Sequence, residues 1–187
     1  MENALIVSST QKSAAIFAEI LKAASISQIT VMQSCGEASR LLIEQDFDLV
    51  IVNAPLKDET GESFARNVAT KTQVILIVKS EIFDAVSAVC EADGVLTIAK
   101  PLNKSVFWSA LTLVKSAHSK IKRVQSENAK LKQKIEDIRI IDRAKCILIS
   151  YMNMHEKEAH RYIEKQAMDL RSTKRAVAEG ILKTYEY

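Results

Sequence analysis

The chain has 187 residues, of which 48% are hydrophobic and 26% charged, with four glycines and two prolines. Such a composition is typical of a globular protein, and the length allows one ordinary domain with a smaller one, or two small domains. Residues 1–113 carry a net charge of −4 and residues 114–187 a net charge of +7. This asymmetry indicates two units, the second of which either binds an anionic partner or presents a solvated basic face.

The three cysteines, Cys35, Cys90 and Cys146, are odd in number and lack metal-ligand spacing, which favours a reduced, cytoplasmic protein. Met1 opens onto a short apolar run without a basic segment, so no signal peptide is expected. No apolar stretch approaches the roughly 20 residues that span a bilayer. These observations exclude secreted, disulfide-stapled and integral-membrane classes.

The first part of the chain alternates short β-branched runs with amphipathic stretches. We expect strands at 4–7, 29–33, 49–52, 74–78 and 95–98, and helices at 12–24, 36–46, 61–70, 81–92 and from 103 onward. The third and fourth strands are apolar at every position, as expected where helices cover both faces of a parallel sheet. The pattern predicts a doubly wound (βα)5 domain of the α/β class, with right-handed crossovers and functional groups at the carboxyl ends of the strands.

Particular residues stand at those strand ends. The first strand is followed by Ser8-Ser9, the third ends in Asn53, and the fifth ends in Lys100-Pro101. Residues 1 to about 117 thereby resemble the receiver domain of bacterial response regulators. Gly61 follows Asn53 at the distance that the receiver pattern requires.

The resemblance implies four functional positions that this sequence fills differently. The family has an acidic pair where Ser8 and Ser9 stand, and a phospho-accepting Asp where Asn53 stands. It has a hydroxyl residue where Val78 stands, with Ser80 close by, and an aromatic residue where Thr97 stands. The residues Ser8, Ser9, Asn53, Val78 and Lys100 are called the receiver pocket below.

The receiver pocket lacks the chemistry of phosphoryl transfer. Mg²⁺ prefers anionic oxygens, and an Asn amide is not a nucleophile. We expect a pseudoreceiver that is not phosphorylated at Asn53, with no catalytic residue, metal or cofactor and with Lys100 solvated or hydrogen-bonded. Lys100-Pro101 is a candidate cis peptide. An α/β enzyme or nucleotide binder is disfavoured because no glycine-rich phosphate loop follows any strand.

From 103 to about 139 the chain has no Gly or Pro, and apolar residues alternate three and four apart. This heptad pattern predicts a parallel, two-stranded coiled coil and hence a homodimer. Asn128 would pair with its symmetry mate and fix the register, or would be exposed where the coil has splayed. The heptad stripe comprises Val114, Ala117, Ile121, Val124, Asn128, Leu131, Ile135 and Ile138.

Three short helices are expected after the coil. The first carries Ile141, Ala144, Leu148 and Met152 and either continues the coil or kinks out of it; the second spans 156–168. The third begins after an N-cap at Ser172 or Thr173.

Four blocks carry a second resemblance. They are Ile-Asp-Arg-Ala-Lys-Cys-Ile-Leu at 141–148, Glu-Ala-His-Arg at 158–161, Ala-Met-Asp-Leu-Arg at 167–171 and Ala-Val-Ala-Glu-Gly-Ile at 176–181. With their spacing, they resemble the ANTAR domain of bacterial transcription antiterminators. Cys146 and Asn153 stand where the family has Gly, so we expect the first helix to end differently.

The resemblance implies RNA as the partner. Family members dimerise and bind paired leader-RNA hairpins with hexanucleotide loops, which prevents a terminator from forming. Loop bases are read by hydrogen bonds and stacking, while Lys and Arg hold phosphates. We expect RNA contacts from Arg143, Lys145, Arg161, Arg171, Ser172, Thr173, Lys174 and Arg175.

Several of these residues have a simpler interpretation. Arg143 and Lys145 could be merely solvated, and Arg171 could cap the carboxyl end of the second helix. Met168 is expected in the core. The tyrosines near the basic residues offer either stacking surface or packing; they are Tyr151, Tyr162, Tyr185 and Tyr187.

We therefore predict a cytoplasmic, dimeric RNA-binding antiterminator that is not an enzyme. Its domains are a pseudoreceiver at 1–117, a coiled-coil linker at 118–138 and an ANTAR domain at 139–187. A regulatory protein partner of the pseudoreceiver is left open, and no membrane partner is expected. The alternatives are a scaffold or sensor that binds protein without reading RNA, and a DNA-binding regulator with a helix-turn-helix tail.

Overall fold

The computed structural model describes residues 1–185, which divide between Lys122 and Arg123 into two compact units. In chain order the first unit contains β1 (Asn3–Ser8), α1 (Gln11–Ala23), β2 (Gln28–Met32), α2 (Cys35–Glu44), β3 (Leu49–Asn53), α3 (Glu62–Ala69), β4 (Gln73–Lys79), the 3-10 helix η1 (Ser80–Ile82), α4 (Phe83–Glu91) and β5 (Leu96–Lys100). Helix α5 (Lys104–Met152) begins in the first unit and ends in the second, which also contains α6 (Glu156–Asp169) and α7 (Lys174–Tyr185).

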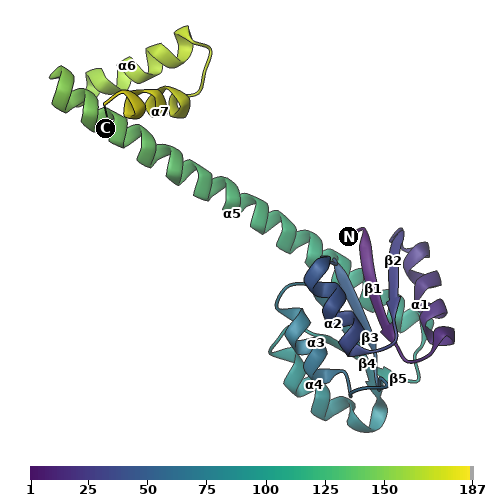
Figure 1. Ribbon diagram of the computed structural model, residues 1–187. Coiled ribbons are helices and arrows are strands. Elements are labelled where there is room, and N and C mark those ends of the chain that lie inside the picture. Colours follow the sequence, from purple (N-terminus) through teal and green to yellow (C-terminus); the bar gives the residue numbers. More distant parts are fainter. Residues whose placement is uncertain (186–187) are drawn as a thin grey trace. The chain divides into compact units, whose positions relative to one another are not determined.

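The five strands form one parallel sheet in the order β2-β1-β3-β4-β5 (Figure 1). Strand β3 is buried along its whole length, and β4 is buried from Val74 to Val78. This burial explains their unbroken apolar sequence, because helices cover both faces of the sheet. The predicted doubly wound architecture is confirmed.

Each face of the sheet has its own core. Helices α2, α3 and α4 cover one face, where Phe64 and Cys90 are buried. Helices α1 and α5 cover the other face, where the rings of Phe17 and Phe107 lie 5.3 Å apart. Each large apolar side chain buried in this way contributes about 1.5–3 kcal/mol to folding.

The core on the side of α1 and α5 shows that one residue of the heptad stripe was wrongly assigned to the dimer interface. Val114 is only 5% exposed and packs on the α1 side of the sheet with Phe107 and Leu111. Its side chain is therefore already covered within one chain and is not free to meet a partner. The heptad stripe that solvent reaches starts after it.

The turn from β3 into α3 requires glycine at one position. Gly61 adopts a φ of 84°, and a Cβ atom placed there would lie 2.9 Å from Cγ1 of Val52. Both the left-handed backbone and the close approach exclude a side chain. This gives a physical reason for the glycine at the distance from Asn53 that the receiver resemblance leads us to expect.

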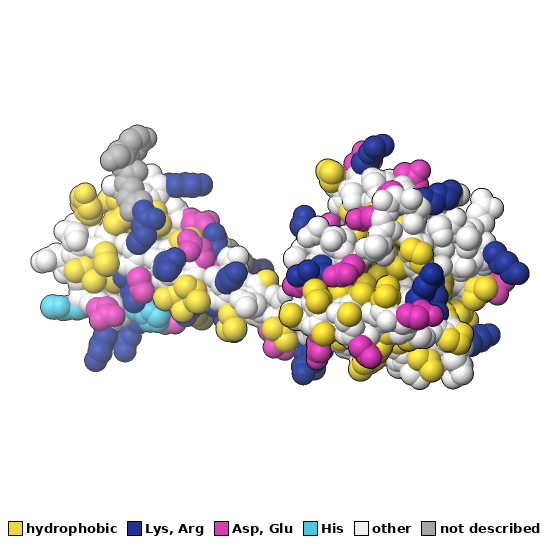
Figure 2. Space-filling model, turned by 90° about the horizontal axis from the view of Figure 1, so that it is seen from below, with side chains coloured by type: hydrophobic (Ala, Val, Ile, Leu, Met, Phe, Trp, Pro, Cys, Tyr) yellow, Lys and Arg dark blue, Asp and Glu magenta, His cyan; other side chains and the backbone are white. Residues whose placement is uncertain are grey.

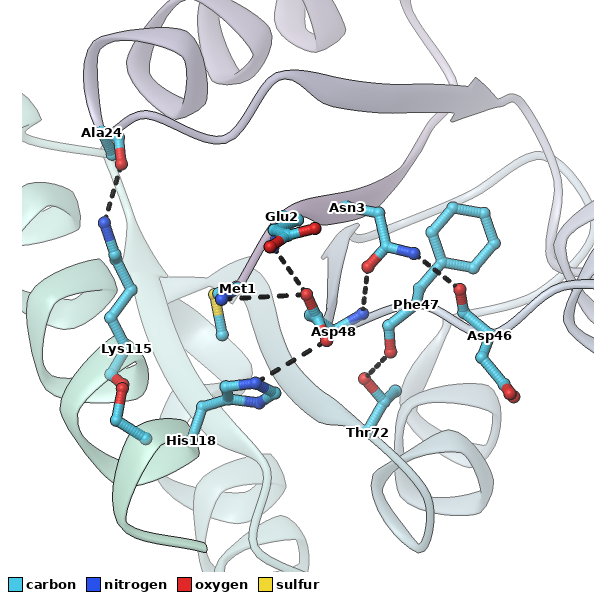
Figure 3. A network of polar contacts seen from close by, with 11 residues as sticks. Met1, Glu2, Asn3, Ala24, Asp46, Phe47, Asp48, Thr72, Lys115 and His118 are labelled. Carbon is cyan, nitrogen blue, oxygen red and sulfur yellow. Dashed lines mark hydrogen bonds and ion pairs between the residues drawn. The ribbon is translucent and has the colours of Figure 1, made fainter. Parts of the chain in front are cut away.

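Polar contacts surround Asp48, just before β3, as Figure 3 shows. The Asp48 carboxylate accepts the Glu2 backbone N–H at 2.6 Å, and the Asn3 carbonyl oxygen of the side chain accepts the Asp48 backbone N–H at 2.9 Å. Nε2 of His118 on α5 lies 3.6 Å from Oδ1 of Asp48. Lys115, one turn earlier, donates from Nζ to the Ala24 carbonyl at 2.7 Å. These contacts fasten the early part of α5 to the rest of the first unit.

The second unit is a small helical core. Ala144 and Leu148 on α5 are buried with residues of α6 and α7: Ala159, Ile163, Ala167, Val177 and Ala178. Helix α5 runs without a break to Met152, so this face continues the helix of the heptad stripe rather than kinking out of it.

Helix α5 ends at Met152, just before Asn153. Cys146 lies inside the continuous helix, and Asn153, which follows the last residue, has a φ of 51°. Asn is one of the few residues that visit this left-handed region readily, because its short polar side chain can bond locally. Asn153 can therefore end the helix in the conformation that Gly adopts most readily.

The contacts of His118 predict a pH dependence of stability. Burial lowers the pKa of the His118 imidazole; Asp48 opposes this shift, whereas the chain's amino group and Lys122 add to it. The unfolded chain therefore takes up the proton more readily, and the folded state loses stability as the pH falls below about 6.5. The difference in melting temperature between the His118→Gln variant and wild type should therefore shift in favour of the variant as the pH falls from about 7 to about 5. Parallel melting profiles across this range would contradict the assignment.

Candidate functional site

The receiver pocket lies at the carboxyl ends of the strands, as predicted. Ser8 ends β1 and is the register partner of Asn53, which ends β3. Nδ2 of Asn53 donates to Oγ of Ser8 at 3.0 Å, and the two residues are 7% and 1% exposed. The amide and the hydroxyl thus satisfy one another in a buried site.

The Lys100 side chain also finds an internal partner. Its Nζ donates to the Ala54 carbonyl at 2.5 Å, and burial, with the nearby Lys79 charge, lowers its pKa. Of the two states expected for Lys100, solvated or hydrogen-bonded, the structure shows the hydrogen-bonded one. The Lys100–Pro101 peptide is cis as expected, and so is Ala54–Pro55.

The remaining pocket positions add no charge. Val78 is buried and contributes only hydrocarbon. Ser9 Oγ reaches the Pro55 carbonyl at 3.5 Å, at the limit of a hydrogen bond, and Ser80 Oγ donates to the Lys100 carbonyl. The pocket therefore offers neutral oxygens and one lysine. Among residues 1–185, no cluster of His, Cys, Asp and Glu could hold a metal ion.

A nearby carboxylate has a role that the sequence did not reveal. Oδ1 and Oδ2 of Asp58 accept the backbone N–H groups of Cys35 and Gly36 at 3.1 and 2.9 Å. The Gly36 N–H is the largest cause that lowers the Asp58 pKa. Asp58 thus ties the loop after β3 to the first turn of α2, where a negative charge is favourable.

In the second unit, three of the predicted RNA-contacting cations are engaged in ion pairs. Lys145 Nζ lies 2.7 Å from Asp142 and 3.7 Å from Glu156, and its side chain is 16% exposed. The hydrogen bond from Lys145 to Asp142 is the main cause that raises the Lys145 pKa. Lys145 thereby links α5 to the start of α6.

Lys174 and Arg175 at the start of α7 are paired in the same way. Lys174 lies 2.5 Å from Glu164 of α6. Arg175 lies 2.7 Å from Asp137 of α5 and 2.8 Å from Glu179, and the bond to Asp137 is the largest cause that raises its pKa. Sequence periodicity does not reveal the pairs with Glu164 and Asp137, because these partners come from other helices. On the face in Figure 2, Lys and Arg side chains of the second unit indeed stand among acidic ones.

The other predicted cations, Arg143, Arg161 and Arg171, are exposed. Arg171 follows α6 with a φ of 48°, while the Ser172 N–H bonds the Ala167 carbonyl at 2.9 Å. The backbone of Arg171 therefore forms the turn that closes α6, and its side chain is left at the surface.

Of the two candidate N-caps of α7, the structure selects Thr173. Its Oγ1 accepts the Ala176 N–H at 3.1 Å. This bond satisfies one of the otherwise unpaired N–H groups of the first turn. Ser172 and Thr173 both remain exposed, next to Arg171.

Met168 is 78% exposed, so its predicted place in the core is wrong. The buried positions of α6 are Ala159, Ile163 and Ala167, four residues apart. Met168 follows the last of them by one residue, which turns it about 100° away around the helix.

Two of the tyrosines form a surface pair, and a third packs. Tyr151 is 69% and Tyr185 38% exposed, with ring centroids 5.5 Å apart, whereas Tyr162 packs against the core. Tyr187 lies outside the described residues. Beside Tyr151 an open groove of about 630 Å³ runs along α5; its lining residues are Arg139, Asp142, Arg143, Cys146, Ile147, Ser150 and Tyr151.

The heptad stripe beyond Val114 is uncovered. Ala117 is half-buried, and Asn128 is exposed. The large apolar members are 45% to 59% exposed: Ile121, Val124, Leu131, Ile135 and Ile138.

Comparison with known proteins gives matches to both parts of the chain. The ANTAR domain family matches residues 129–182. The "Transcriptional regulatory protein PdtaR" of Mycobacterium tuberculosis is 29% identical over 139 residues, which are 73% of this chain and 68% of that protein. The "Nitrate regulatory protein" of Klebsiella oxytoca is 29% identical over 86 residues, 46% of this chain and 21% of that protein.

Solved structures match the fold of the first unit. The signal receiver domain of a putative Luxo repressor protein from Vibrio parahaemolyticus superimposes with a TM-score of 0.58 at 17% identity, over 66% of this chain and 96% of that one. A receiver domain of an HD domain-containing protein from Pseudomonas fluorescens gives a TM-score of 0.55 at 17% identity, over 65% and 92%.

No helix within residues 1–185 is both long and apolar enough to cross a membrane. The sequence matches are to regulators, and a receiver fold precedes the ANTAR domain. Residues 129–182 thus match the ANTAR domain family and the first unit has the receiver fold, so both resemblances inferred from the sequence are confirmed.

Proposed function

We propose that this protein is a cytoplasmic, RNA-binding regulator of transcription antitermination and has no enzymatic activity. As a dimer it binds paired hairpins with hexanucleotide loops in leader RNA and prevents a terminator from forming. The observation that carries this proposal is the ANTAR domain at residues 129–182. We retain the division into a pseudoreceiver at 1–117, a linker at 118–138 and an RNA-binding domain at 139–187.

The exposed heptad stripe supports the dimer. Isolated apolar side chains are common on surfaces, but a row at heptad spacing along one helix is typical of a coiled-coil seam. In a parallel dimer, Asn128 would meet its symmetry mate and select the register. Two RNA-binding domains would then be held together, so that binding of one hairpin raises the effective concentration at the second.

The exposure of three arginines and two hydroxyl residues supports an RNA-contacting face. Arg143, Arg161 and Arg171 would contact phosphates and loop bases, and the hydroxyls of Ser172 and Thr173 would add polar contacts. Lys145, Lys174 and Arg175 are paired with carboxylates of neighbouring helices and would serve to hold the three helices together.

The neutral receiver pocket supports regulation without phosphorylation. Asn53 is hydrogen-bonded to Ser8, and no carboxylate of the pocket would bind Mg²⁺. The input would then come from a protein that binds the pseudoreceiver or from control of dimerisation.

A phosphorylation assay tests this part of the proposal. Treated with acetyl phosphate and Mg²⁺, the protein should keep its intact mass. The Asn53→Asp variant should also stay unmodified, because Ser8 and Ser9 still supply no carboxylate to the metal. A gain of one phosphoryl group by the wild-type chain would contradict the proposal.

The RNA-binding proposal is tested on a two-hairpin leader RNA, against a copy with scrambled loops at the same salt. Wild type should bind the first RNA tightly and the second weakly. The Arg171→Gly variant should lose about tenfold or more of the specific affinity. Its free energy of unfolding should change by no more than about 1 kcal/mol, because Gly suits the left-handed backbone.

The Lys157→Ala variant is the matched control, since it removes one exposed cation of α6 that is not assigned to RNA. It should bind nearly as wild type does. Equal, weak and salt-sensitive binding of wild type to both RNAs would favour the protein-binding scaffold instead.

A further inference from the structure

We propose that Tyr151 is the platform on which the second unit stacks an unpaired RNA base, with the base seated in the groove along α5. The inference rests on the proposed RNA-binding function and deepens it, because it names a residue that discriminates loop bases. It is carried by the geometry around Tyr151 and by the chemistry of the groove.

The ring of Tyr151 is held by a neighbouring ring, yet most of its surface is exposed to solvent. Its ring lies against the Tyr185 ring, with centroids 5.5 Å apart and planes at 37°, yet the residue is 69% exposed. An aromatic ring held by a neighbour loses little conformational freedom when a ligand stacks on it. Tyr162, by contrast, packs against the core and is half-buried, so it offers no comparable surface.

The groove beside the ring matches the chemistry of a nucleotide. Ile147 and Tyr151 supply apolar surface for the face of a base, and Ser150 supplies a hydroxyl for its edge. Arg139 and Arg143 supply positive charge for the phosphates; Arg139 lies 3.8 Å from Glu136, a loose pair. The groove, of about 630 Å³, is open to solvent, and its described lining residues all lie on α5, so a base could reach the Tyr151 ring from outside.

Charge complementarity favours nucleic acid over a peptide as the occupant. The lining has two arginines and one carboxylate, Asp142, which is already paired with Lys145 at 2.7 Å. A base that stacks on Tyr and is flanked by Arg is the usual mode of single-stranded RNA recognition, and hairpin loops expose such bases.

The first test compares Tyr151→Ala and Tyr151→Phe with wild type on the two-hairpin RNA at several salt concentrations. Tyr151→Ala should weaken specific binding by about 5- to 150-fold, the range for one stacked base. The salt dependence should keep its slope, because no phosphate contact is lost. Tyr151→Phe keeps the stacking face, so it should bind nearly as wild type does.

The second test uses the chain's own thiols and needs no variant. Cys146 is exposed and lines the groove, whereas Cys35 and Cys90 are buried, and burial raises the pKa of both. N-ethylmaleimide should therefore modify Cys146 first in the folded protein. Saturating two-hairpin RNA should slow this modification, and the scrambled RNA at the same concentration should not.

The outcomes separate this inference from the function beneath it. If wild type discriminates the two RNAs but Tyr151→Ala binds equally well, or if Cys146 reacts at the same rate in the complex, the stacking site is wrong and the RNA-binding function stands. If wild type does not discriminate the RNAs, both fall. Should Tyr151→Ala melt at a lower temperature, the protection of Cys146 in wild type still decides the question.

Discussion

The apolar periodicity of one helix constrains the whole chain. Helix α5 buries Phe107, Leu111 and Val114 in the first unit and Ala144 and Leu148 in the second, with an uncovered heptad stripe between. A single helix can present all of these surfaces because, at 3.6 residues per turn, the spacing of its apolar residues decides which side of the helix is apolar in each segment. Any input that acts on the early part of α5 acts on the element that also builds the proposed RNA-binding domain.

Part of the charge in the second unit serves to hold its helices together. A core built from the end of α5 and two short helices is small, and the ion pairs of Lys145, Lys174 and Arg175 tie these helices to one another. Exposed pairs of this kind are each worth little, about 0–1 kcal/mol, but they fix which cations stay available. Fewer cations are therefore unpaired than the sequence count suggests, and under the proposed function specificity would depend on arginine geometry and base stacking.

Strand-helix alternation and unbroken apolar runs predicted the sheet, because strands that are buried on both faces must be apolar along their whole length. The site was less predictable. Glu156, a partner of Lys145, and Asp137, a partner of Arg175, lie on other helices, so only the tertiary fold reveals these two pairs. Met168 is apolar but lies one residue past the buried row of α6, and Val114 belongs to the heptad pattern but is covered by the first core. Local patterns name residue types, whereas packing decides which of them remain free.

The central claim is that one dimer engages two hairpins. Sedimentation of the full-length chain, alone and with a two-hairpin leader RNA, tests it most directly. We predict a dimer at micromolar concentration and two chains per RNA in the complex, with Ile135→Lys giving a monomer that binds each hairpin weakly. A wild-type monomer that binds the hairpins independently, with unchanged affinity when they are separated, would contradict the account.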